Sequence, residues 1–236
     1  MITKAIKRAS QFPEYPDVAW IRQVFERVQR IPGANKLFKR LASAPDKNQF
    51  SDYFTEVEYA LVFAGLGFKV TIEPLGPKGP DFEVSRDGQY AMVEITRFRD
   101  ISPGPPEFNI YDSILPDYGN PQRDTRKSFD KLLSKFNQVK DNNSIIALWN
   151  DDGDLEEVEV RMAVECLRRG KARQTLKVPE GLLFVIYASK WVRLGDHKQI
   201  YCFSLIDHVQ TQYSMWQHEL GNATVRDLMN RAIMQE

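Results

Sequence analysis

Apolar and polar residues alternate along this chain with two periods, one typical of helices and one typical of strands. Asp17–Ile31 carries an apolar side chain every three or four positions, and Pro16 and Pro32 bracket it, which predicts a helix. We expect a short second helix over Asn35–Leu41 and a longer one over Ser51–Leu66. The chain is therefore predicted to begin with helices.

A group of three strands is predicted next. Phe68–Glu73 and Asp81–Ser85 are short segments with strand periodicity, separated by a turn rich in Pro and Gly. Arg86–Gln89 contains Asp-Gly, a favoured pair for a hairpin turn, and Tyr90–Thr96 is the expected returning strand. The sheet is therefore expected to be antiparallel at its start.

Helices and strands alternate in the second half of the chain. The spacing predicts helices over Arg123–Lys140 and Leu155–Arg169, and strands over Ser144–Trp149, Leu182–Ala188 and Gln199–Ile206. This order of elements is typical of an α/β sandwich, in which helices flank a mixed central β-sheet that contains a later crossover.

Two segments stand outside this alternation. Arg99–Pro121 is rich in Pro, Gly, Asp and Asn, and loops of this length are commonly functional. Asp207–Glu236 is expected to form one or two helices. We therefore divide the chain into an N-terminal helical extension (1–50), an α/β core (51–206) and a C-terminal helical tail (207–236).

Composition and charge narrow the class of protein. Of the 236 residues, 42% are hydrophobic and 27% charged, which is ordinary for a folded globular protein and excludes wholesale disorder. Lys+Arg and Asp+Glu both total 32, so the chain as a whole is not basic. Nine Lys and Arg residues lie between Met1 and Arg40. They leave two interpretations open, a DNA-facing arm or a solvated helix surface.

Membrane and export signals are not evident. The longest apolar run, Leu182–Ala188, is too short to span a bilayer, so no membrane partner is expected. The N-terminus lacks the apolar stretch of a signal peptide. Cys166 and Cys202 have neither metal-ligand spacing nor a disulfide framework, and we expect two buried free thiols. These features favour a cytoplasmic protein.

Three acidic residues occupy positions from which they could converge. Glu58 lies on the helix stripe expected to face the sheet, Asp81 opens a strand directly after Pro80, and Glu94 interrupts an apolar strand. A buried carboxylate is costly unless it is paired or bound to a metal. The alternative for each is ordinary: an ion-paired or solvent-facing Glu, or an Asp in a turn. If the three converge, they could share one divalent metal ion.

The combination of Pro80-Asp81, Glu94-Ile95-Thr96 and an upstream helix Glu58 resembles the PD-(D/E)XK nuclease superfamily, which has the restriction-endonuclease-like fold. The order helix, three strands, helix, strand is also similar to the core of that family, and the resemblance covers approximately Ser51 to Trp149. It implies an α/β fold with a restriction-endonuclease-like core, a mixed central sheet flanked by helices, and helical additions at both termini.

The resemblance also implies a chemistry. Asp81 and Glu94 would hold Mg²⁺, with Mn²⁺ as a substitute, while Glu58 would join them and the carbonyl of Ile95 would complete the shell. The protein would then be a Mg²⁺-dependent nuclease that hydrolyses phosphodiester bonds by a metal-activated water. DNA is the expected partner in preference to RNA, and a homodimer would suit cleavage of both strands.

One position departs from the family pattern. Thr96 stands where the family usually has a Lys that orients the attacking water, and Thr cannot carry charge. On the following helix, Lys135 with Gln138 resembles an arrangement seen in some branches of the family, and Arg126 and Arg97 are alternative basic residues for the missing Lys. Arg97, Arg126 and Gln138 are the candidates for contacting nucleic acid. Either the Lys has migrated, with Thr96 and Lys135 in supporting catalytic roles, or the fold is catalytically inactive and binds nucleic acid or protein.

Overall fold

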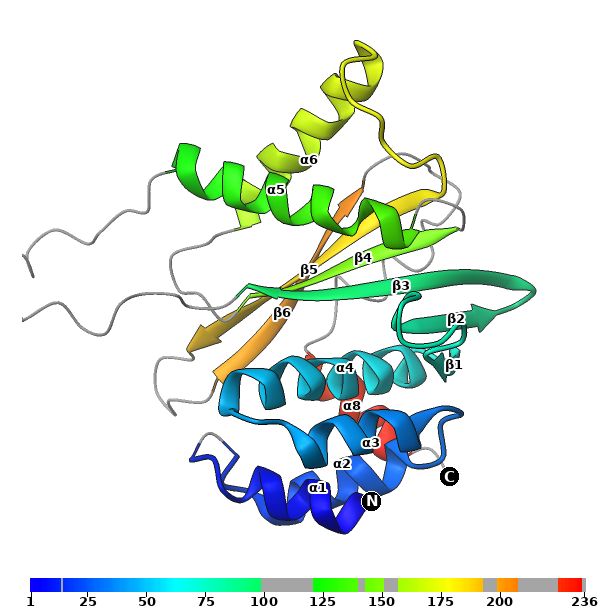
Figure 1. The fold of residues 1–236 in the computed structure, drawn as a ribbon, viewed down its shortest axis with the longest axis vertical. Coiled ribbons are helices and arrows are strands. Elements are labelled where there is room, and N and C mark those ends of the chain that lie inside the picture. The colour runs from blue at the N-terminus through cyan, green and yellow to red at the C-terminus, as the bar shows by residue number, and fades with distance from the viewer. Residues whose placement is uncertain are drawn as a thin grey trace, which may run out of the picture.

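A computed structural model describes residues 1–13, 15–98, 121–139, 143–150, 157–192, 199–207 and 225–234 of the chain. Nearly all of the predicted loop over Arg99–Pro121 lies outside these described residues, as does most of the predicted tail over Asp207–Glu236. The described residues form helices on both sides of one sheet (Figure 1).

Six strands form a single mixed sheet in the order β1-β2-β3-β4-β5-β6. The strands are β1 (Lys69–Ile72), β2 (Phe82–Arg86), β3 (Gln89–Phe98), β4 (Ser144–Asn150), β5 (Leu182–Val192) and β6 (Gln199–Asp207). The first three pair antiparallel, β3, β4 and β5 pair parallel, and β6 returns antiparallel. The predicted mixed sheet with an antiparallel start and a later crossover is therefore confirmed.

Helices cover both faces of the sheet (Figure 1). One face packs against α5 (Pro121–Val139) and α6 (Glu157–Ala172). The other packs against a layer of helices: α1 (Ile2–Ala9), α2 (Val18–Val28), α3 (Ala34–Ser43), α4 (Lys47–Gly65) and α8 (Val225–Met234). Each face of the sheet has its own hydrophobic core. In the larger helical layer, α4 lies between the sheet and the outer helices α1, α2 and α3 (Figure 1).

An N-cap residue explains where α4 begins, and a contact with β4 shows which side of the helix faces the sheet. The carboxylate of Asp46 accepts a hydrogen bond of 2.8 Å from the backbone N–H of Gln49, so this N-cap starts the helix before the predicted Ser51. The hydroxyl of buried Tyr59 donates to the carbonyl of Leu148 in β4 at 2.8 Å. The stripe of α4 that contains Tyr59 therefore faces the sheet.

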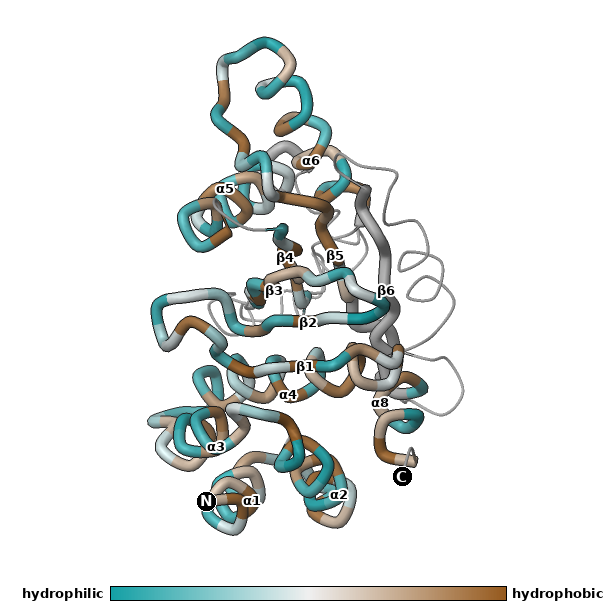
Figure 2. Tube along the Cα trace, turned by 90° about the vertical axis from the view of Figure 1, so that its right-hand side faces the viewer, coloured by the Kyte–Doolittle hydropathy of each residue, from teal (hydrophilic) through white to brown (hydrophobic). Residues whose placement is uncertain are grey.

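The central strands are buried on both faces. Figure 2 shows β5 as a long hydrophobic stretch between the helical layers, and every residue of Leu182–Ala188 is buried, as predicted. Among the described residues, no helix is both long and apolar enough to cross a membrane. One expectation is corrected: Cys166 is a free thiol but exposed, because it lies on the outer side of α6.

The edge of β3 is covered by β2 along only part of its length. β2 pairs with β3 from Gln89 to Val93, and β2 begins at Phe82, so its register does not reach the second half of β3. On the opposite side, β4 pairs with β3 as far as Phe98. Glu94 and the residues after it therefore lie at an edge that β2 leaves uncovered, and the candidate site is found there.

Candidate functional site

A pocket of about 680 Å³ lies at this edge of β3, between α4 and α5. Four acidic residues, four basic residues and a few neutral ones line it: Asp52, Glu56, Asp81, Glu94, Ile95, Thr96, Arg97, Phe98, Lys127, Lys131, Lys135 and Gln138. Seven of these were singled out from the sequence: Asp81, Glu94, Ile95, Thr96, Arg97, Lys135 and Gln138.

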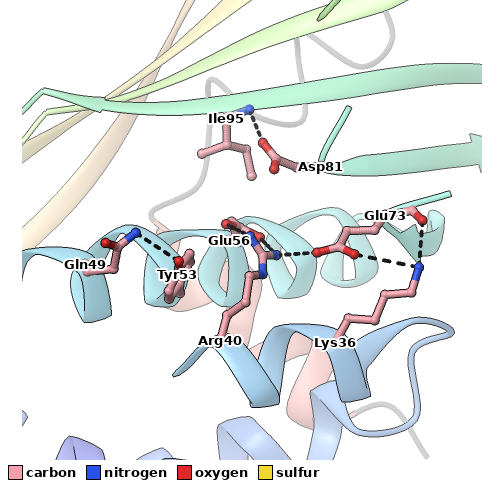
Figure 3. A network of polar contacts seen from close by, with 8 residues as sticks. All are labelled: Lys36, Arg40, Gln49, Tyr53, Glu56, Glu73, Asp81 and Ile95. Carbon is pink, nitrogen blue, oxygen red and sulfur yellow. Dashed lines mark hydrogen bonds and ion pairs between the residues drawn. The ribbon is translucent and has the colours of Figure 1, made fainter. Parts of the chain in front are cut away.

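Asp81 and Glu94 meet because of the strand register. Phe82 pairs with Val93, so continuing the antiparallel register by one residue sets Asp81 opposite Glu94. The backbone N–H of Ile95 donates a 2.8 Å hydrogen bond to Oδ2 of Asp81, which holds this carboxylate against the strand (Figure 3). The predicted convergence of these two acids is thus a direct result of the hairpin.

Lys135 reaches the same point from the helix. Its Nζ lies 2.6 Å from Oε1 of Glu94, and the two side chains are 20% and 2% exposed. Glu94 faces α5 because side chains alternate along β3, and Val93 and Ile95 pack into the core on the α4 side. The basic residue predicted on the helix after β3 therefore contacts the strand acid directly.

Burial and mutual repulsion shape the ionisation of the two acids. Burial, with the nearby charge of Asp81, raises the pKa of Glu94 from 4.5 to about 7, although the Lys135 ammonium and the Gln138 side chain oppose this rise. Burial also raises the pKa of Asp81, against the opposing effects of the Ile95 N–H and Lys135. Oε2 of Glu94 is buried, and among the described residues it has no hydrogen-bond partner.

The helix acid in the pocket is Glu56, and the expected Glu58 does not line it. Side chains two positions apart on an α-helix point in directions that differ by roughly 200°, so Glu56 and Glu58 point to opposite sides of α4. Glu56 lies three residues before Tyr59, on the stripe that faces the sheet. Twelve of the nineteen residues of α4 are buried, because the helix has neighbours on both sides, and its apolar pattern could not tell these sides apart.

An ion-pair network joins α3 to the floor of the pocket (Figure 3). Nη1 and Nη2 of Arg40 lie 3.0 and 2.5 Å from the two carboxylate oxygens of Glu56, and Nη2 is also 3.0 Å from Glu73. Lys36 adds a longer contact of 3.7 Å to Glu73. Burial, together with the charge of Asp81, raises the pKa of Glu56 well above its usual range, while Arg40 opposes the rise.

The remaining candidates divide between the pocket and the solvent. Thr96 is buried in the pocket wall, and Arg97 lines the α4 side, where it lies 3.5 Å from Asp52. Gln138 lines the α5 side. Arg126, in contrast, is 84% exposed, lies 3.8 Å from Asp130 and is outside the pocket. The structure therefore does not bring this expected nucleic-acid contact to the site.

Two lysines in the pocket were not singled out from the sequence. Lys127 and Lys131 precede Lys135 by two turns and one turn of α5, so the three share one side of the helix. The spacing of the three lysines, four residues apart along the sequence, is the signal that could have identified Lys127 and Lys131 beside Lys135. Two cations of the basic N-terminal segment, Lys36 and Arg40, pair with buried glutamates, so part of that segment is structural.

The donor set limits what metal the pocket could hold. In the described part of the chain, no group of three or more His, Cys, Asp and Glu side chains is arranged to hold a metal ion. The expected set of Glu58, Asp81 and Glu94 therefore does not form, and Arg40 already binds both oxygens of Glu56. Asp81 and Glu94 remain as a pair of carboxylates beside the carbonyl of Ile95.

No family model matches the chain, and no curated protein matches it. One solved structure is similar, the CdiA-CT/CdiI toxin and immunity complex from Burkholderia pseudomallei: 18% sequence identity, 70% of this chain and 91% of that chain covered, and a TM-score of 0.37. A likeness at this level carries no argument about this chain.

Proposed function

We propose that the protein is a Mg²⁺-dependent nuclease with a restriction-endonuclease-like core, which hydrolyses phosphodiester bonds of DNA. The observation that carries this proposal is the 2.6 Å contact between Lys135 and Glu94 beside Asp81. Two carboxylates and one lysine at a single pocket are the groups that metal-assisted phosphodiester hydrolysis needs. Lys135 supplies from the helix the positive charge that Thr96 cannot supply from the strand.

The residues present fit Mg²⁺. This ion is usually bound by one or two carboxylates, with water and substrate phosphate completing its shell. Asp81 and Glu94 would hold it, with the Ile95 carbonyl nearby, and the buried Oε2 of Glu94 is a carboxylate oxygen that lacks a hydrogen-bond partner among the described residues. When bound, the ion would lower the pKa of a water molecule and neutralise charge on the phosphate.

The protein's own groups have separate tasks in this proposal. The N–H of Ile95 keeps the Asp81 carboxylate in one orientation. Lys135 would donate hydrogen bonds to the attacking water or to the phosphate oxygens, where negative charge grows in the transition state. Thr96 can contribute a hydroxyl donor from the same wall. Arg40 keeps both carboxylate oxygens of Glu56 engaged.

The test is cleavage of plasmid DNA, single-stranded DNA and RNA by the purified protein with Mg²⁺, with Mn²⁺, and with EDTA. We expect DNA cleavage that requires the metal and is lost in Glu94→Gln and in Lys135→Met. Arg126→Gln, a substitution on the exposed side of α5, should cleave like the wild type. Cleavage that persists in Glu94→Gln would show that another site is responsible.

The second candidate is a catalytically inactive fold that binds nucleic acid or protein, and Thr96 is the observation that favours it. The same experiment separates the two. If wild type and Glu94→Gln are equally inert on all substrates, yet the wild type binds nucleic acid, the binding module is the better account.

A further inference from the structure

We propose that Lys127, Lys131 and Lys135 form a ladder that binds three consecutive phosphates of one nucleic-acid strand, whatever its base sequence. This inference rests on the proposed function, because it assigns the phosphate contacted by Lys135 to the reacting position. It adds the direction in which the strand leaves that position, along α5 towards its N-terminal end.

Helix geometry supports the ladder. Residues four apart lie on the same side of an α-helix and are separated by about 6 Å along its axis. All three lysines line one pocket, and each is half-buried. Successive phosphates of one strand are spaced comparably, so one lysine can meet each phosphate.

The distribution of charge confines the strand to this wall. The α4 side of the pocket presents two carboxylates, Asp52 and Glu56, against one cation, Arg97, and Asp81 and Glu94 lie at the sheet. These acids would repel a phosphate backbone, whereas the lysines of α5 would attract it. A strand entering the pocket is therefore expected to follow α5, with its phosphates turned towards the helix.

The residues that line the pocket also predict that the protein does not recognise the base sequence of the strand. Among the described residues that line the pocket, one is aromatic: Phe98, of which only 2% is exposed. It therefore offers no face on which a base could stack. Phosphate contacts position a strand without carrying sequence information. Oligonucleotides of unrelated sequence should accordingly bind with similar affinity.

The test measures the affinity of a short fluorescent single-stranded oligodeoxynucleotide at several salt concentrations, in EDTA so that no cleavage occurs. Each phosphate contact contributes about 0.7 to the slope of log Kd against log salt concentration for a single strand. We expect the slope to fall by about this amount in Lys127→Gln, by the same amount in Lys131→Gln, and by about twice as much in the double variant. Two oligonucleotides of unrelated sequence should give the same slopes.

Matched variants guard against loss of folding and against a general charge effect. Arg169→Gln removes one positive charge from α6, outside the pocket, and should leave the slope unchanged. Lys127→Arg and Lys131→Arg keep the charge and should keep the slope. Thermal unfolding of each variant confirms that the measured protein is folded.

The outcomes separate this inference from the proposed function. If the protein cleaves DNA but the slope is unchanged in the double Gln variant, the ladder is refuted and the nuclease stands. If the slopes fall as expected but no substrate is cleaved, the ladder stands and the nuclease fails. A slope that falls equally in Arg169→Gln would also refute the ladder, because the effect would then be one of total charge.

Discussion

Glu94→Gln should make the metal-free protein more stable at pH 8 while it removes activity. A carboxylate whose pKa is raised on folding binds its proton more tightly in the folded chain than in the unfolded one. Its contribution to stability therefore falls as pH rises from 4.5, the ordinary value, to about 7, the value in the pocket. Gln is nearly the same shape and does not ionise, so it avoids this loss.

The magnitude follows from the size of the pKa change. One pKa unit corresponds to about 1.4 kcal/mol, so a rise from 4.5 to about 7 corresponds to about 3 kcal/mol. The variant and the wild type should therefore be equally stable near pH 4, and the variant should be about 3 kcal/mol more stable at pH 8. For a chain of this length, that gain corresponds to a Tm about 6–12 °C higher.

The assay is urea denaturation in EDTA at several pH values between 4 and 8, followed by circular dichroism. Glu165→Gln, on the half-exposed surface of α6, is the control and should change stability by less than about 0.5 kcal/mol at every pH. Adding Mg²⁺ at a hundred times its Kd should restore about 2.7 kcal/mol to the wild type and little to the variant. A gap between variant and wild type that does not grow with pH would refute the reasoning.

Four further substitutions, in three experiments, test other parts of the structure. Lys135→Met should lower the rate of cleavage by about a hundredfold or more in single-turnover kinetics. If the two positions serve one site, adding Thr96→Lys to this variant should recover part of the lost rate. Arg40→Met should cost about 3 kcal/mol of stability in thermal unfolding, because it leaves two buried glutamates without their shared cation. Gly65→Ala should destabilise the packing of α4 on α8, because a Cβ there would lie 2.0 Å from the backbone oxygen of Leu228, and hydrogen exchange of α8 should accelerate.

The strand pattern could be predicted because local signals agreed with the final packing. The Asp87-Gly88 turn sets the β2–β3 register, and this register alone brings Asp81 to Glu94. The partner of Glu94 could also be predicted, because the sequence identifies Lys135 on the next helix as a candidate. In these cases the relevant contact is decided by a hairpin, or by a helix that packs on the sheet through one apolar side.

The helix acid could not be assigned in the same way. α4 has the sheet on one side and further helices on the other, so both Glu56 and Glu58 lie next to apolar residues in sequence. The hydrogen bond of Tyr59 to Leu148 shows which side meets the sheet, and these two residues are 89 positions apart in the sequence, so no local pattern reveals the contact. The pairing of Glu56 with Arg40 of α3 is equally non-local.

The charge balance of the pocket suggests how metal and substrate would depend on each other. Four acidic and four basic side chains line the pocket, so their formal charges balance without a metal ion. A divalent cation at Asp81 and Glu94 would compete with the Lys135 ammonium for Oε1 of Glu94. Displaced from this carboxylate, Lys135 would be available to a phosphate.

Metal and nucleic acid should therefore bind cooperatively through Lys135. Coupling between two ligands is reciprocal and is commonly about fivefold or more, so Ca²⁺, another oxygen-liganded cation, should tighten oligonucleotide binding by at least about fivefold in the wild type. In Lys135→Met the enhancement should shrink, because the displaced ammonium is missing, although neutralisation of the two carboxylates would persist. Fluorescence anisotropy with and without Ca²⁺ measures both factors. An equal enhancement in the two proteins would mean that Lys135 stays on Glu94 when the cation binds, and that the phosphate is held by other groups.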